Sequence, residues 1–487
     1  MGENILVLDA GTTSTRAILF AADGALIRVA QRDLTQHYPR PGWVEHDAGE
    51  IWDRTLACAR EAIGDDADSI AAIGITNQRE TVVAWDKKSG QPLARAIVWQ
   101  DRRTAEFCAG LKDQGHEPDV QARTGLLLDP YFSATKMRWL LDHDEAVRGA
   151  SERGDLAFGT VESWLVFNLA ERAHVSDASN ASRTLLLPLD EEQFDPALCE
   201  LFGVPRESLP RVVDTHGALA ECSEEWFGRA IPICGLVGDQ QSATIGQACL
   251  EFGQTKGTYG TGAFVLTNNG RTIPRSTHRL LGTVLSQRDG ERVYAIEGAA
   301  FVAGSLIQWL RDGLGLIESA AETEDLARSI PDSGEVVIVP ALAGLGAPHW
   351  LPQARGVIAG LSFASGRAQL ARAALESMAH QTHDLATAFA ADGAPWSMLR
   401  IDGGMAANDW MAQDLADMLG IDVERPDFVE TTALGAAFCA AVGVGLYPSL
   451  EDAAQAMRGK TRCFRPRIDE DARAERLARW RKALAAA

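Results

Sequence analysis

Residues 5–16 read ILVLDAGTTSTR, and this stretch decides the fold of the first half of the chain. The apolar run from Ile5 to Leu8 is too short for a helix, and its branched residues are typical of a buried strand. Asp9 closes the run, and Gly11 follows where a tight turn needs a residue without a Cβ atom. Hydroxyl residues fill positions 12–15, so the turn can hold a Mg-phosphate, with amides and hydroxyls facing the oxygens and the acid facing the metal. A polar β-hairpin turn is the alternative, and the stretch alone does not decide between them.

The composition limits the partners and the location of the protein. A chain of 487 residues is too long for one core, so two domains are expected. The net charge of −21 disfavours nucleic acid and anionic membranes as partners. Eight cysteines are scattered without a CxxC pair, which predicts neither a zinc site nor a disulfide framework. Without a basic, apolar leader or an apolar run of membrane length, the chain is expected to be cytoplasmic and not inserted in a membrane.

Strands and helices follow from the hydrophobic pattern. In the first half we expect strands over 15–20, 25–34, 70–76, 82–85, 96–99 and 231–237, and helices over 48–63, over 135–141, after 160 and from 242. Asp47 is expected to cap the first helix, and residues 172–187 are expected to be irregular and polar. In the second half we expect strands over 263–268, 336–340 and 399–402, helices over 298–310, 368–390 and 431–442, and an amphipathic tail after 469.

A second turn of the same kind lies half a chain after the first. Residues 256–262 read KGTYGTG and precede the strand expected over 263–268. The simplest inference is two halves of similar architecture facing each other across a cleft, with a boundary between 245 and 255. A third glycine-rich turn, at 402–408, ends in Asn408. Loops at strand ends can converge in a cleft, although each alone could be an unrelated surface turn and Asn408 is better read as a helix N-cap.

Two acids at strand ends are candidates for chemistry. Asp239 ends the strand over 231–237, where an acid facing a cleft can accept a hydroxyl proton during phosphoryl transfer; the alternative is a helix cap. Arg79 and Glu80 follow the strand over 70–76 and suit vicinal hydroxyls, because Arg donates and Glu accepts hydrogen bonds. A solvated loop pair is the commoner alternative for these two residues. Trp99 and Phe264 can wall the carbon backbone of a small ligand, although aromatic residues at strand positions are more often core residues.

Long blocks along the chain match the signatures of a known family, whereas neither a GxxxxGK[ST] P-loop nor a GxGxxG Rossmann loop occurs. YFSATKMRWLLDH (131–143) matches the first family signature, and GVIAGL (356–361) with QL (369–370) and AALE (373–376) matches the second. On these blocks the chain resembles the FGGY family of carbohydrate kinases over nearly its whole length. Similarity to the members that phosphorylate glycerol comes from GITNQRET (74–81), IVWQDRRT (97–104), DPYFSATK (129–136), NASRT (180–184), GDQQ (238–241) and TYGTGAF (258–264).

The resemblance implies an α/β fold of two actin-like ATPase (ribonuclease H-like) domains, each a mixed sheet flanked by helices, with a cleft between them. The N-terminal FGGY domain, 1–250, would carry the first phosphate loop, the acceptor pocket and the base. The C-terminal FGGY domain, 251–487, would carry the second phosphate loop, the adenine side and the C-terminal helices. The implied reaction transfers the γ-phosphate of Mg-ATP to a terminal hydroxyl of glycerol, giving sn-glycerol 3-phosphate for glycerol catabolism. A homodimer or homotetramer is implied as well.

The resemblance also assigns roles to matching positions. Asp239 matches the catalytic base, and Asp9 and Asp239 are the acids expected near Mg²⁺. The glycerol pocket is matched by Arg79, Glu80, Trp99, Tyr131, Asp239, Gln240 and Phe264. The nucleotide site is matched by Thr12, Thr13, Ser14, Arg16, Gly260, Thr261, Gly304, Gln308, Gly404 and Asn408.

Some positions depart from the family, and two other functions remain open. Residues 216–229 read HGALAECSEEWFGR, without the glycine- and lysine-rich effector loop of some members, so control by a sugar bisphosphate is not expected. In that region His216 alone offers a histidine phospho-acceptor, and His349 stands where an aromatic residue is expected.

A kinase for a pentulose or another polyol is disfavoured by NQRET and DPYFSATK. A nucleotide-binding switch is disfavoured by Asp239 together with Arg79 and Glu80, because a switch needs no acceptor pocket.

Overall fold

The first sheet grows from the opening stretch of the sequence. The computed structural model describes residues 2–351, 353–428 and 430–487. In it β1 (Asn4–Ala10), β2 (Ser14–Phe20) and β3 (Leu26–Asp33) form the expected antiparallel meander. On its other side β1 runs parallel to β5 (Ile70–Asn77), β5 runs parallel to β12 (Ile231–Gly238), and β11 (His216–Cys222) completes the sheet. The carboxyl ends of β1, β5 and β12 therefore meet at one edge, where Asn77 pairs with both Ala10 and Gly238.

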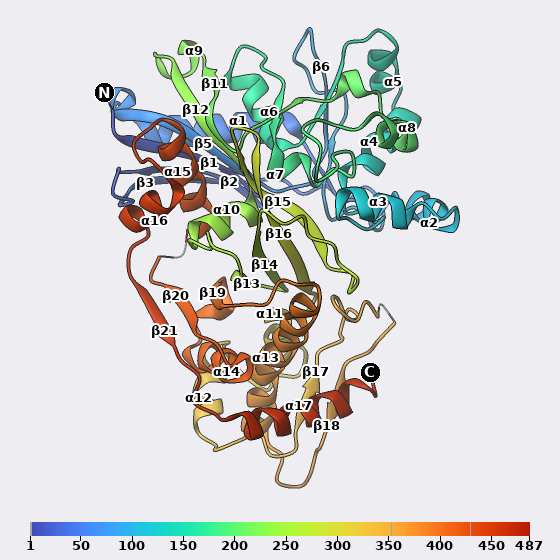
Figure 1. Cartoon of the computed structure of the whole chain (residues 1–487), viewed down its shortest axis with the longest axis vertical. Coiled ribbons are helices and arrows are strands. Elements are labelled where there is room, and N and C mark those ends of the chain that lie inside the picture. Colours follow the sequence, from blue (N-terminus) through green and yellow to red (C-terminus); the bar gives the residue numbers. More distant parts are fainter. Residues whose placement is uncertain (1, 352, 429) are drawn as a thin grey trace.

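The second sheet has seven strands in the order β15-β16-β14-β13-β19-β20-β21. Its strands are β13 (Gln254–Tyr259), β14 (Ala263–Gly270), β15 (Leu281–Arg288), β16 (Glu291–Ala300), β19 (Met398–Asp402), β20 (Val423–Pro426) and β21 (Thr461–Phe464). Because β13 and β19 are parallel and Thr258 pairs with Asp402, their carboxyl ends also lie together. Both sheets mix parallel and antiparallel pairs, as the resemblance implied, and each is flanked by helices (Figure 1).

The helices N-terminal to β13 are α1 (Ala48–Ile63), α2 (Ala105–Asp113), α3 (Glu117–Thr124), α4 (Ser133–His143), α5 (Glu145–Glu152), α6 (Val161–Leu169), α7 (Ala178–Ala181), α8 (Pro196–Phe202), α9 (Glu224–Phe227) and α10 (Asp239–Gly246). After β16 come α11 (Gly304–Gln308), α12 (Glu322–Arg328), α13 (Arg367–Ala391), α14 (Asp409–Leu419), α15 (Thr431–Gly443), α16 (Leu450–Met457) and α17 (Glu470–Leu484). Two-stranded sheets pair β4 (Glu45–His46) with β7 (Ala96–Ile97), β6 (Val83–Asp86) with β8 (Leu156–Gly159), β9 (Val175–Asp177) with β10 (Arg211–Val213), and β17 (Val337–Val339) with β18 (Val357–Ala359).

Helices α15 and α16 return to the first sheet although they follow the second sheet in the sequence. In Figure 1 they lie beside the N-terminal strands, and α15 packs against β1, β5, β12 and α10. This packing needs glycine: a Cβ atom on Gly74 would lie 2.6 Å from the Ala436 carbonyl oxygen, and one on Gly435 would lie 1.8 Å from that of Ser242. The domain boundary expected at 250/251 falls between α10 and β13. The chain returns to the first sheet at α15.

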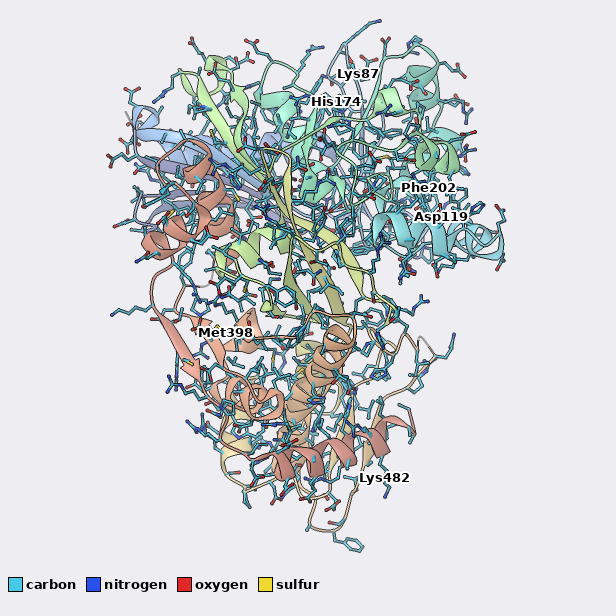
Figure 2. All side chains as sticks on the ribbon, in the orientation of Figure 1. Lys87, Asp119, His174, Phe202, Met398 and Lys482 are labelled. Carbon is cyan, nitrogen blue, oxygen red and sulfur yellow. The ribbon has the colours of Figure 1, made fainter. Side chains whose placement is uncertain are left out.

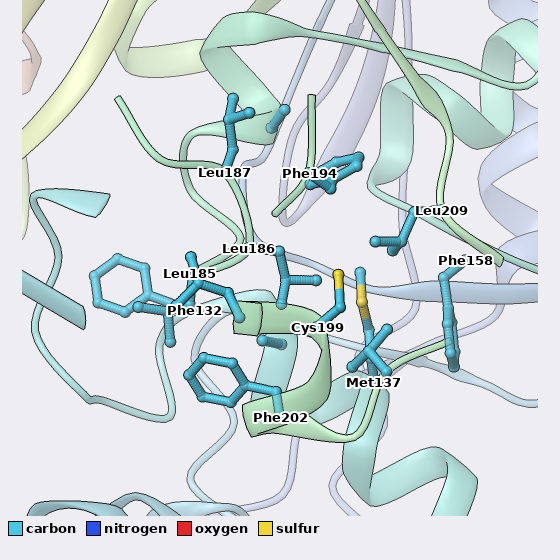
Figure 3. Close-up of a cluster of buried hydrophobic side chains, with 14 of the residues drawn as sticks. Phe132, Met137, Phe158, Leu185, Leu186, Leu187, Phe194, Cys199, Phe202 and Leu209 are labelled. Atoms are coloured by element: carbon cyan, nitrogen blue, oxygen red, sulfur yellow. The ribbon is translucent and has the colours of Figure 1, made fainter. Parts of the chain in front are cut away.

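A large apolar cluster packs around α4 and α8. It includes Phe132 and Met137 of the α4 region, Leu185 to Leu187, and Phe202 of α8, which Figure 3 shows gathered around Cys199. In Figure 2, Phe202, Lys87, His174 and Asp119 lie in the upper half of the molecule, whereas Met398 and Lys482 lie in the lower half. Among the described residues, no helix is both long enough and apolar enough to cross a membrane.

Several sequence predictions agree with these elements, and a few were wrong. Helix α1 spans the predicted residues, and the Asp47 side chain caps it by accepting from the Glu50 amide. The helix predicted over 298–310 begins later than expected, because β16 continues to Ala300 by pairing with β14, and α11 begins at Gly304. Residues 172–187 are not an irregular polar segment: they contain β9 and α7, and polar side chains such as Arg183 are buried. The helix predicted from 242 begins at Asp239.

Candidate active site

A small cavity lies where the ends of β5 and β12 approach the second sheet. Its volume is about 60 Å³. The cavity is lined by Arg79, Glu80, Trp99, Tyr131, Asp239, Gln240 and Phe264. These are the seven residues that the resemblance assigned to the acceptor pocket, and the fold brings them together from five separate parts of the sequence.

Arg79 and Glu80 leave the end of β5 and are buried, so they are not the solvated loop pair that was the alternative. Arg79 donates to both carboxylate oxygens of Glu297, with Nη1–Oε2 at 2.8 Å and Nη2–Oε1 at 3.2 Å. Glu80 has a positive φ of 60°, a conformation that costs a residue with a side chain and marks functional turns. Arg183 Nε donates to Glu80 Oε1 at 2.7 Å, which fixes the carboxylate inside this strained turn.

Two residues of this charged cluster were not among the predicted site residues. Arg183 is fully buried, bonds Glu80, and also reaches Glu297 Oε1 at 3.3 Å. Glu297 lies in the middle of β16, and although burial by itself raises its pKa, Arg183 and Arg79 outweigh that effect and lower the pKa to about 2. A sequence signal for Glu297 exists, since an acid interrupts the apolar run VYAIEGAA at 293–300, but no strand was expected there and residues 298–300 were assigned to a helix. Arg183 lies in the block NASRT (180–184), which carried the resemblance but was given no role in the site.

Trp99 and Tyr131 wall one side of the cavity. Their rings meet edge to face with centroids 5.6 Å apart. Burial raises the pKa of the Tyr131 hydroxyl, which stays protonated and accepts from Arg79 Nη2 at 3.4 Å. Tyr131 is held from behind, because Lys136 of α4 is buried and donates to the Tyr131 and Phe132 carbonyl oxygens. Phe264 of β14 comes from the second sheet.

Asp239 is the first residue of α10, directly after the N-cap Gly238. Its Oδ1 accepts from the Gln240 amide at 2.7 Å and lies 3.3 Å from Arg79 Nε. It therefore does not cap the helix through a later amide, which was the alternative. Burial raises the pKa of Asp239 to about 6, against the charges of Arg79 and Lys256, which lower it. A carboxylate with this pKa is a stronger base than an ordinary aspartate and is still ionised at neutral pH.

The first glycine turn joins β1 to β2 and is a β-hairpin, as its alternative interpretation stated. The Gly11 amide donates to the Ser14 carbonyl at 3.0 Å, and Trp99 Nε1 donates to Thr12 Oγ1 at 2.9 Å. Thr13 is exposed at the tip. One hydrogen bond thus joins this turn to the cavity wall.

Asp9 and Arg16 face each other across that hairpin. Arg16 forms ion pairs with Asp9 and with Glu430, which directly precedes α15. Burial raises the pKa of Asp9, and the Arg16 charge opposes this effect. Arg16, predicted at the nucleotide, is therefore held between two carboxylates, one on β1 and one at the start of α15.

The remaining predicted nucleotide residues gather at the ends of β13 and β19. The Gly304 amide donates to the Gly260 carbonyl at 2.8 Å, and the Ala303 amide donates to the Thr261 carbonyl at 2.9 Å. Gln308 is exposed at the end of α11, and Gly404 is exposed with open space where a Cβ atom would lie. Asn408 caps α14 by accepting from the Met411 amide at 2.9 Å, in agreement with the preferred interpretation of this residue.

The donor set fits a magnesium ion that arrives with phosphate. Within the described residues, no group of three or more His, Cys, Asp or Glu side chains could cage a metal. Mg²⁺ is usually held by one or two carboxylates, waters and substrate phosphates rather than by an all-protein cage. Asp9, beside the first phosphate loop, and Asp239, beside the acceptor cavity, supply carboxylates of this kind.

Comparison with known proteins identifies the class that this fold and site define. The N-terminal domain model of the FGGY family of carbohydrate kinases matches residues 4–246, and the C-terminal domain model matches residues 256–444. The chain belongs to the FGGY family of carbohydrate kinases.

Relatives within the family carry a more specific name. A glycerol kinase of Rhodospirillum centenum is 52% identical over 490 residues, covering 99% of this chain and 98% of that protein. The crystal structure of Plasmodium falciparum glycerol kinase with ADP matches with a TM-score of 0.95 at 33% identity, covering 100% of this chain and 98% of the other. A gluconate kinase of Lactobacillus acidophilus matches with a TM-score of 0.89 at 21% identity, over 99% of this chain and 98% of that one, and so shares the fold.

Proposed function

We propose that this protein is a glycerol kinase that transfers the γ-phosphate of ATP to a terminal hydroxyl of glycerol, giving sn-glycerol 3-phosphate and ADP. The observation that carries the proposal is the small polar cavity with Asp239 in its wall and the first phosphate loop bonded to it through Trp99. Its small volume and polar lining suit a small polyol. Relatives named glycerol kinase at 52% identity support the same acceptor.

The residues divide the work as phosphoryl transfer requires, since this reaction needs positioning and charge neutralisation more than covalent help. Arg79 donates to hydroxyl oxygens of the acceptor, while Glu80 accepts from its hydroxyl groups. Asp239 takes the proton of the terminal hydroxyl of glycerol. At the same time the hydroxyl oxygen bonds to the γ-phosphorus, and the bond between the γ-phosphorus and the bridging oxygen of ADP breaks. Trp99, Tyr131 and Phe264 exclude water, which otherwise competes with glycerol as acceptor.

The nucleotide is expected at the two glycine turns. Thr12, Thr13, Ser14 and Arg16 would contact phosphates from the first sheet, and Gly260 and Thr261 from the second. Gly304, Gln308, Gly404 and Asn408 would face the nucleoside. Mg²⁺ held by Asp9, Asp239 and the phosphates supplies charge neutralisation when ATP is bound. A cytoplasmic homodimer or homotetramer is part of this proposal, and light scattering of the purified protein tests the assembly.

An acceptor panel tests the proposal. Purified protein with Mg-ATP is expected to release ADP much faster with glycerol than with xylulose, ribulose, gluconate or no acceptor. Equal rates with all acceptors would contradict a glycerol kinase, and a basal rate unaffected by any acceptor would favour a nucleotide switch. Arg79→Ala is expected to raise KM for glycerol far more than KM for ATP, because Arg79 lies in the acceptor cavity and not at the glycine turns.

A further inference from the structure

Lys256 is a buried lysine behind the acceptor cavity that the reaction described above does not use. It lies on β13, four residues before Gly260, and its side chain is fully buried. Its Nζ reaches across to the first residues of α10 and donates to Gln240 Oε1 at 2.6 Å. A residue of the second sheet therefore holds a cavity residue that directly follows Asp239.

The burial of this ammonium group is costly, so a purely structural role is poorly served by it. An ammonium group has three donors and no acceptor. In the part of the chain that the structure describes, Gln240 Oε1 is its one hydrogen-bond acceptor. An isolated buried charge is strongly penalised, and burial indeed lowers the pKa of Lys256, while the charges of Asp402 and Asp239 favour its charged form. An apolar side chain would fill the same space without this penalty.

The bond from Lys256 decides which end of the Gln240 amide faces the cavity. Lys256 can only donate, so the oxygen end of the amide must point toward it. The NH₂ end of Gln240 is then left for the cavity that this residue lines. The cavity thereby presents a donor in Gln240 next to an acceptor in Asp239, a pair that suits a hydroxyl group giving up its proton.

We propose that Lys256 is a positioning residue of the transfer site, which fixes the Gln240 NH₂ group toward the acceptor hydroxyl. This inference rests on the proposed glycerol kinase activity. It gives β13 two tasks, because the same strand carries the second phosphate loop at its end and orients the acceptor site from its middle.

The test compares KM for glycerol, KM for ATP and kcat in the full chain. Lys256→Met removes the donor at similar length. We expect KM for glycerol to rise about five- to tenfold from the loss of one charge-assisted hydrogen bond, while KM for ATP stays near the wild-type value. Because Lys256 acts through Gln240, Lys256→Met should add little to Gln240→Met in the double variant.

Lys136→Met is the matched control, because Lys136 is also a buried lysine of the site but bonds the Tyr131 and Phe132 carbonyl oxygens and not Gln240. It is expected to raise KM for glycerol and to add its full effect to that of Gln240→Met. An unchanged KM for glycerol in Lys256→Met, or an effect that adds in full to that of Gln240→Met, overturns the proposal. If Lys256→Met does not fold, Lys256→Gln takes its place and is judged by the same two outcomes. Wild-type protein without glycerol-dependent ADP release refutes the proposed function instead.

Discussion

Arg79 and Glu297 form a two-point ion pair that joins the end of a strand in the first sheet to the middle of a strand in the second. Both side chains are about 2% exposed. Glu297 also accepts from Arg183, which holds Glu80, so two arginines and two glutamates form one buried cluster beneath the acceptor cavity. The acceptor site is therefore built from residues of both sheets, and the alignment of Arg79 depends on the second sheet.

Removing Glu297 is expected to damage stability and glycerol binding together. Glu297→Ala leaves Arg79 and Arg183 buried without this carboxylate, which we expect to cost about 3–5 kcal/mol in the free energy of unfolding. KM for glycerol should rise more than KM for ATP. Denaturant unfolding and steady-state kinetics measure the two effects. Glu291→Gln, at the exposed start of the same strand, breaks only a surface pair with Arg271 and should change stability by less than about 1 kcal/mol.

The pH dependence of the rate should report the ionisation of Asp239. The base must be deprotonated, and its pKa is about 6, so kcat/KM for glycerol should be flat above pH 7 and fall tenfold per unit well below pH 6. Asp239→Asn should lower kcat by at least about 10²-fold while ATP binding, followed by calorimetry, persists. A profile that stays flat down to pH 5, or an active Asp239→Asn enzyme, would remove Asp239 from the role of base.

The same substitution should stabilise the fold at neutral pH. Because burial raises the pKa of Asp239 from 3.8 to about 6, the folded state binds this proton more tightly than the unfolded state does. The ionised group therefore costs stability that appears as the pH rises from about 4 to 6 and stays constant above. The shift corresponds to at most about 3 kcal/mol, and partial exposure screens it, so we expect a gain of about 1–2 kcal/mol for Asp239→Asn at pH 7.5. The gain should vanish near pH 4, and a loss at pH 7.5 would contradict the assignment.

Local patterns predicted the fold well where a strand or a helix is encoded by its own residues. The meander from β1 to β3 and helix α1 with its Asp47 cap are of this kind, because alternation and capping are local properties. The predicted start of the helix at 298 was wrong. The small residues there suit a helix, whereas the ladder with β14 holds residues up to Ala300 in a strand. Likewise Glu297 became a site residue only through tertiary contacts with Arg79 and Arg183. Five of the seven cavity residues were candidates from their own positions at strand ends or in strands, whereas Tyr131 and Gln240 were assigned to the pocket only through the resemblance.

The bond between Trp99 and Thr12 is expected to couple the acceptor cavity to the nucleotide. Trp99 Nε1 donates to Thr12 Oγ1 at 2.9 Å, so the indole that walls the cavity also fixes the first phosphate loop. Trp99→Phe keeps an aromatic wall but removes the donor, and Thr12→Val removes the acceptor at nearly equal volume. A hydrogen bond of this kind contributes about 1 kcal/mol, so each change should raise KM for ATP about fivefold beyond any effect on glycerol.

A double-mutant cycle shows whether the two residues act as one unit. If the bond carries the effect, the double variant should be no worse toward ATP than Thr12→Val alone, giving a coupling of about 1 kcal/mol. Trp226→Phe is the matched control, because that indole also donates one hydrogen bond, to the Asn168 carbonyl at 3.1 Å, but lies outside the cavity lining. It should leave both KM values unchanged. Strictly additive effects of Trp99→Phe and Thr12→Val would mean that the cavity wall and the phosphate loop bind their substrates independently.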